Sequence, residues 1–208
     1  MTEAAVETAE RAQIYLVTPG EIALSTFPDQ LAACLDRVSV ACVRLALSSH
    51  DEGLIGQTAD RLRTVTEARD VALVIEKHFV LAERLGLDGV HLTDGARSIK
   101  AARKALGEDA IVGSFCGTSR HDGMTAAEMG ADYVSFGPVS ASALGDGTQA
   151  DADLFDWWSE MIEVPVVAEG LLQEGDARDL AARADFVALG DLLWQAEDPA
   201  ARLEGLAL

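Results

Sequence analysis

Basic residues are scarce in this chain. Among its 208 residues there are 16 Lys plus Arg against 35 Asp plus Glu, which gives a formal net charge of −19. A field of that sign repels nucleic-acid backbones, anionic membranes and phosphorylated compounds, so we expect neither a nucleic-acid nor a membrane partner. A phosphate ligand would need a local site built from backbone N–H groups and helix N-termini. The simplest consequence of the acidity is solubility.

Cysteines and long apolar runs are also few. The three cysteines, Cys34, Cys42 and Cys116, form no C-x-x-C pair, which argues against a disulfide scaffold and fits a reducing cytoplasm. No segment approaches the roughly 20 apolar residues of a membrane-spanning helix. Residues 1–12 are rich in Ala and Glu, unlike a signal peptide or an anchor, and we predict a flexible tail there. A cytoplasmic location is therefore expected.

The chain repeats one unit, a short apolar run followed by a helix-like segment. The eight runs are nearly continuous in apolar character, as strands covered on both faces are. They are Gln13–Pro19, Ala41–Leu47, Val71–Lys77, Gly89–Asp94, Ala110–Cys116, Tyr133–Val139, Val164–Gly170 and Phe186–Leu192. This alternation predicts right-handed βαβ units and one α/β domain over residues 13–208, a closed (β/α)8 TIM barrel. An open flavodoxin-like sheet is the alternative, but it needs only about five strands.

Functional side chains of such a barrel follow the strand ends. Glu76 and Lys77 close the third run and Glu169 ends the seventh, and a charge at the end of an apolar strand must reach water, a partner or a ligand. Lys77 and Glu169 are candidate catalytic residues, facing each other as an ion pair or as a proton-transfer pair with shifted pKa values. Neighbouring side chains of a strand point to opposite faces, so the alternative that Glu76 or Lys77 contacts only solvent stays open.

Several segments resemble the thiamine phosphate synthase/TenI family. Ile14–Thr18 (IYLVT) resembles its first strand, Gly86–Leu92 (GLDGVHL) its G-A-D-G-V-H-L, and Gly130–Val139 (GADYVSFGPV) its G-A-D-Y-I-G-F-G-P-V. Val164–Ala168 (VPVVA) resembles the start of P-V-V-A-I-G-G, and the spacing between these segments is kept. The signatures are specific for the fold rather than for the activity, because they consist mostly of packing and turn residues.

The resemblance implies a role in thiamine biosynthesis. The family's synthase joins a pyrimidine diphosphate to a thiazole phosphate and releases pyrophosphate, using Mg²⁺ and basic residues. Departing pyrophosphate is highly charged, so cations must neutralise it as the bond breaks. In the family's thiazole tautomerases a histidine after the fifth strand serves as acid or base. His121 lies several residues later than that position and is our third catalytic candidate.

The family's charged positions are largely replaced in this chain. Where the family's second strand ends Q-L-R-x-K, residues 44–48 read RLALS, so both expected cations are absent and Arg44 stands at the glutamine. The two metal-binding aspartates correspond to Lys77 and Ala96, so we expect no metal cofactor although the family implies Mg²⁺. Ser140–Gly147 lacks the phosphate-holding lysine. Ordinary synthase activity is therefore expected to be weak or absent.

The other strand ends supply the candidate ligand-binding residues. These are Arg44, Glu76, Asp94, Gly137, Gly170, Gly190 and Asp191. Gly170 and Gly190 stand at the usual barrel phosphate site, but the acids next to them argue against a dianion. His91, inside the fourth run, is expected to be a hydrogen-bonded barrel histidine, and Cys116 a small packed residue.

Three functions remain open. The first is a weak synthase or thiazole-type isomerase, and the second is a diverged barrel enzyme that acts on another small molecule through Lys77 and Glu169. The third is a non-catalytic member that binds a metabolite or a partner protein, with Trp157–Trp158 at an interface or, alternatively, packed against the barrel. The partner we expect is a small-molecule ligand, and formation of a homo-oligomer stays open.

Overall fold

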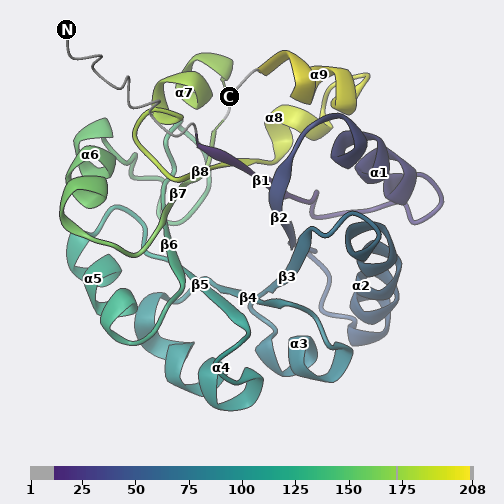
Figure 1. Cartoon of the computed structure of the whole chain (residues 1–208), viewed down its shortest axis with the longest axis horizontal. Coiled ribbons are helices and arrows are strands. Elements are labelled where there is room, and N and C mark those ends of the chain that lie inside the picture. The colour runs from purple at the N-terminus through teal and green to yellow at the C-terminus, as the bar shows by residue number, and fades with distance from the viewer. Residues whose placement is uncertain (1–11, 172, 207–208) are drawn as a thin grey trace, which may run out of the picture.

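Eight parallel strands form a closed barrel (Figure 1). The computed structural model describes residues 12–171 and 173–206, so the tail predicted for residues 1–12 lies outside the described residues except for Ala12. Each strand pairs with the next along the chain, and β8 pairs with β1. The prediction of a (β/α)8 TIM barrel is confirmed, and the open sheet is wrong because β1 and β8 close the ring.

Each of the eight predicted runs coincides with a strand, and β2 begins one residue before its run. The strands are β1 (Gln13–Val17), β2 (Val40–Leu45), β3 (Ala72–Glu76), β4 (Gly89–Leu92), β5 (Ile111–Phe115), β6 (Tyr133–Phe136), β7 (Val166–Ala168) and β8 (Phe186–Leu189). The helices around them are α1 (Phe27–Arg37), α2 (Glu52–Glu67), α3 (Phe79–Leu85), η1 (Gly95–Ser98), α4 (Ile99–Leu106), α5 (Arg120–Glu128), α6 (Ala152–Met161), α7 (Glu174–Leu180), α8 (Asp191–Trp194) and α9 (Pro199–Leu206).

Local sequence explains where several helices begin and end. Asp51 precedes α2, and its carboxylate accepts hydrogen bonds from the backbone N–H groups of Gly53 and Leu54 at 2.8 and 3.2 Å. Gly86 ends α3 in the left-handed conformation, with a φ of 63°. No described helix is both long enough and apolar enough to cross a membrane.

A mainly apolar layer of side chains fills the barrel interior near the middle of the strands. Tyr15, Cys42, Val74, Tyr133, Val167 and Ala188 pack together there. A larger apolar core lies between the strands and the surrounding helices, and Trp158 is fully buried in it. The Trp158 indole N–H donates to the Val164 carbonyl at 2.7 Å, so packing against the barrel is confirmed for this residue. Trp157 is half-buried beneath the guanidinium of Arg120.

Gly113 on β5 makes room for the Tyr133 ring, and we expect the variant Gly113→Ala to be destabilised. A Cβ atom at residue 113 would lie 1.9 Å from that ring. The resulting overpacking should lower the free energy of unfolding by about 1–3 kcal/mol in urea denaturation. Gly175→Ala in α7 is the matched control, because nothing lies within 4 Å of its new methyl group. Equal stability of the Gly113 variant and the wild type would contradict this packing.

Candidate active site

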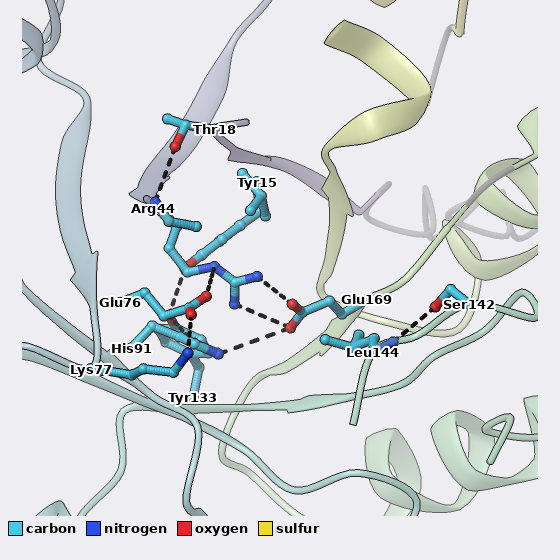
Figure 2. Close-up of polar contacts among 12 residues, drawn as sticks. Tyr15, Thr18, Arg44, Glu76, Lys77, His91, Tyr133, Ser142, Leu144 and Glu169 are labelled. Carbon is cyan, nitrogen blue, oxygen red and sulfur yellow. Dashed lines mark hydrogen bonds and ion pairs between the residues drawn. The ribbon is translucent and has the colours of Figure 1, made fainter. Parts of the chain in front are cut away.

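Charged side chains from three strands meet at the upper end of the barrel, where the strands finish (Figure 2). Arg44 is on β2, Glu76 is the last residue of β3, and Glu169 directly follows β7. Arg44 is only 3% exposed and Glu169 only 5%. Two fully charged groups at that depth are costly unless they are paired and hydrogen-bonded.

Arg44 and Glu169 form this pair. The guanidinium donates through Nη1 to Oε2 of Glu169 at 3.2 Å and through Nη2 to Oε1. Burial alone would raise the pKa of Glu169, but the adjacent Arg44 outweighs it and lowers that pKa to about 2. Burial likewise opposes the charged form of Arg44, and Glu169 raises the pKa of Arg44 above its ordinary value. Both groups therefore stay charged at neutral pH.

Glu76 extends this pair into a row of alternating charges. One of its oxygens lies 3.7 Å from Nε of Arg44, and the other lies 2.8 Å from Nζ of Lys77. The ion pair expected between Lys77 and Glu169 is not formed, because each residue has a different partner. Arg44, on the inner face of β2, is long enough to reach Glu169 across the barrel. Lys77 has a φ of 68°, which turns the chain out of β3, and 58% of its side chain is exposed.

A buried chain of polar groups lies below the pair. The imidazole Nδ1 of His91 is 2.9 Å from the Tyr133 hydroxyl, which is 2.7 Å from the Tyr15 hydroxyl. Burial and then the charge of Arg44 lower the pKa of His91 to about 3, so the ring is neutral. The His91 Nε2 atom lies 3.9 Å from Glu169 Oε2. A proton on Nε2 therefore faces this carboxylate and leaves Nδ1 to accept a hydrogen bond from the Tyr133 hydroxyl. The expectation that His91 is a hydrogen-bonded barrel histidine is confirmed.

A cavity of about 320 Å³ lies beside the Arg44–Glu169 pair. It brings together five of the predicted site residues, which are Arg44, Glu169, Gly170, Gly190 and Asp191. The remaining lining residues are Val17, Thr18, Ser142, Ala143, Leu144, Leu171 and Ala188. Gly137 does not line the cavity. A Cβ atom there would lie 2.4 Å from the Glu169 carbonyl oxygen, so Gly137 leaves space for the backbone that positions this carboxylate.

Other predicted residues lie away from this cavity. His121 is exposed in the first turn of α5, and Asp94 accepts a hydrogen bond from Ser98 at 2.7 Å near η1. Glu76 and Lys77 stand at the rim on the β3 side, and Lys77 lines a separate polar pocket with His78. Cys116 is buried, and burial raises its pKa to about 11, so its thiol stays protonated.

Sequence reasoning missed two kinds of residue. Tyr15 and Tyr133 lie in the predicted strands, but strand alternation alone does not say which face points into the barrel. Leu144 belongs to the segment Ser140–Gly147, from which no site residue was predicted, and it lines the cavity. Its apolar character within a small-residue segment was the available signal.

The family's Mg²⁺ does not fit the residues present. By the resemblance, Lys77 and Ala96 correspond to the family's two metal-binding aspartates, and an ammonium group and a methyl group offer Mg²⁺ no oxygen ligand. The carboxylates of Glu76 and Glu169 already contact cationic side chains. Within residues 12–171 and 173–206, no group of three or more His, Cys, Asp or Glu side chains is arranged to hold a metal ion.

A closed barrel with a cavity at the C-terminal ends of its strands has the architecture of (β/α)8 enzymes. Residues 14–192 match the family model described as thiamine monophosphate synthase. The chain is 41% identical over 184 residues to the thiamine-phosphate synthase of Rhodospirillum centenum, across 88% of this chain and 89% of that one. It is 37% identical over 201 residues to the thiamine-phosphate synthase of Erythrobacter litoralis, with 94% of each chain covered.

The fold comparison agrees with these relatives. The solved structure of a thiamine phosphate pyrophosphorylase from Pyrococcus furiosus superimposes with a TM-score of 0.80, across 94% of this chain and 93% of that one. Its sequence identity of 22% supports the fold alone. The sequence matches show that this chain belongs to the thiamine monophosphate synthase family.

We expect Glu169→Gln to lower the free energy of unfolding by about 3–5 kcal/mol, because it leaves the buried Arg44 with only the more distant Glu76. The double variant Arg44→Met/Glu169→Leu, which removes both charges, should recover most of that loss. Asp36→Asn is the control at the exposed pair with Arg69, where little change is expected. Chemical denaturation would test this, and an unchanged free energy of unfolding for Glu169→Gln would contradict this account of the pair.

His91 should make the protein less stable as the pH falls. Its folded-state pKa of about 3 is below the unfolded value, so the unfolded state binds the proton first. Between about pH 6.5 and pH 3, this difference in pKa lowers the free energy of unfolding by on the order of 1.4 kcal/mol per pH unit. Urea titrations at several pH values should show a flatter profile for His91→Gln, and the wild-type slope for the exposed control His121→Gln. Parallel profiles of the wild type and His91→Gln would rule this out.

Proposed function

We propose that this family member does not couple pyrimidine diphosphate to thiazole phosphate at an ordinary rate, and that its barrel mouth binds a small molecule other than a diphosphate. The observation that supports this is the neutralisation of the mouth's cations. Arg44 contacts Glu169 and Glu76, and Lys77 contacts Glu76. The row contains two cations and two carboxylates, so it has no net charge to offer to a diphosphate.

The cost of rearranging this row supports the same conclusion. A diphosphate that took Arg44 as its partner would leave Glu169 buried, unpaired and close to the new anion. In enzymes that stabilise developing negative charge, the loss of one donor slows the reaction by about 10²–10³-fold. The proposal therefore includes no metal cofactor and no step in which pyrophosphate leaves against Mg²⁺.

The roles of the catalytic candidates follow from their surroundings. Glu169, whose pKa Arg44 holds at about 2, stays a carboxylate and serves to position Arg44 rather than to donate a proton. Lys77 is exposed at the rim, where it can meet a ligand. His121, on the surface of α5, has no role in this proposal. We further propose a small molecule as the partner and the cytoplasm as the location.

The coupling reaction tests this proposal directly. With pyrimidine diphosphate, thiazole phosphate and Mg²⁺, we expect thiamine phosphate to form at least about 100-fold more slowly than with the Rhodospirillum centenum relative assayed in parallel. A rate comparable to that of the relative would refute the proposal.

A variant can show whether the carboxylates of the row are what prevents binding of a diphosphate. Glu76→Gln frees Lys77 and the Nε side of Arg44, so it should bind inorganic pyrophosphate more tightly than the wild type does. Glu83→Gln removes the same charge from an exposed position on α3 and should leave binding unchanged. Equal affinities for Glu76→Gln and the wild type would show that another feature excludes the anion.

A further inference from the structure

The cavity beside the Arg44–Glu169 pair contains one charge that the pair does not compensate. Arg44 and Glu169 neutralise each other, which leaves the exposed carboxylate of Asp191 as the remaining charged group of the lining. Arg202, a cation near Asp191, pairs with Glu174 instead. Among the described residues, no side chain forms a hydrogen bond or an ion pair with the Asp191 carboxylate. The cavity therefore has a local charge of one negative unit.

The rest of the lining is mainly apolar. Val17, Ala143, Leu144, Leu171 and Ala188 form most of the wall. Thr18 adds a hydroxyl whose oxygen accepts from the Ala46 backbone N–H at 3.0 Å, so its own proton remains available to a ligand. An apolar wall with a few polar groups is typical of sites for small organic ligands.

We propose that this cavity binds an unphosphorylated organic cation, with an apolar ring against Leu144 and Leu171 and the positive charge near Asp191. The inference rests on the proposed function, in which the mouth rejects diphosphates, and adds the sign of the ligand's charge. A volume of about 320 Å³ is at the lower end for small-molecule sites, which favours a single ring over a linked pair of rings.

Electrostatics distinguishes three classes of ligand, which are organic cations, neutral compounds and phosphate esters. A cation is attracted both by Asp191 and by the long-range field of a chain with a net charge of −19. A neutral ligand gains from burial of apolar surface alone, and a phosphate ester is repelled by both fields. Because Glu169 is occupied by Arg44, the preference for a cation should depend on Asp191.

Three probes that share one ring test the inference. They are the neutral hydroxyethyl-methylthiazole, its N-methylated thiazolium cation, and the phosphate ester of the neutral compound. In calorimetric titrations at low salt we expect the cation to bind roughly fivefold more tightly than the neutral probe, with a smaller ratio at high salt. The phosphate ester should bind most weakly.

Two variants that each remove one negative charge show whether Asp191 causes the preference for the cation. Asp191→Asn should reduce the ratio of the two affinities to the smaller preference that the long-range field of the chain provides, and leave the affinity for the neutral probe unchanged. Asp109→Asn removes the same charge from an exposed residue before β5, at the opposite end of the barrel, and should keep the wild-type ratio. Circular dichroism would establish that both variants are folded.

The outcomes separate the two proposals. Equal affinities for the cation and the neutral probe in the wild type, no binding of any probe, or an unchanged preference in Asp191→Asn would overturn this inference and leave the proposed function standing. Binding of the phosphate ester or of inorganic pyrophosphate ahead of the cation would overturn both.

Discussion

Two buried side chains of opposite charge, Arg44 from β2 and Glu169 from the end of β7, meet at the centre of the barrel mouth. Neither is tolerable at that depth without the other, since an unpaired charge at so low an exposure is strongly destabilising. Glu76 and Lys77 extend the contact toward solvent, and His91 adjoins it from below. The chemistry of the mouth therefore depends on this one pair.

In the function we propose, the pair is also what separates this chain from the coupling reaction of its family. The barrel, the matched residues 14–192 and the relatives at 41% and 37% identity place the chain in the thiamine monophosphate synthase family. A synthase must present uncompensated positive charge to a departing pyrophosphate. Here the mouth's basic groups already face carboxylates, and Asp191 gives the adjoining cavity a negative charge. Family membership and the local electrostatics thus point to different ligands.

Much of the fold could be predicted because each apolar run coincides with a strand, as Val71–Lys77 does with β3. Strand ends also predicted Arg44, Glu169 and Asp191, since parallel strands bring their C-terminal ends to one face. The pairing was not predictable, because β2 and β7 are not neighbours in the sheet and only the closed barrel sets their separation. His121 lies away from the cavity because α5 begins within a few residues of the end of β5 and exposes that side chain.

Calorimetric titration of the purified protein with the pyrimidine diphosphate in the presence of Mg²⁺ tests the central claim most directly. If Arg44, Lys77 and their carboxylates form a neutral row, no binding heat should appear at micromolar concentrations of the diphosphate. Micromolar binding that depends on Mg²⁺ would contradict the account, since it would require cations that the row of paired charges does not provide.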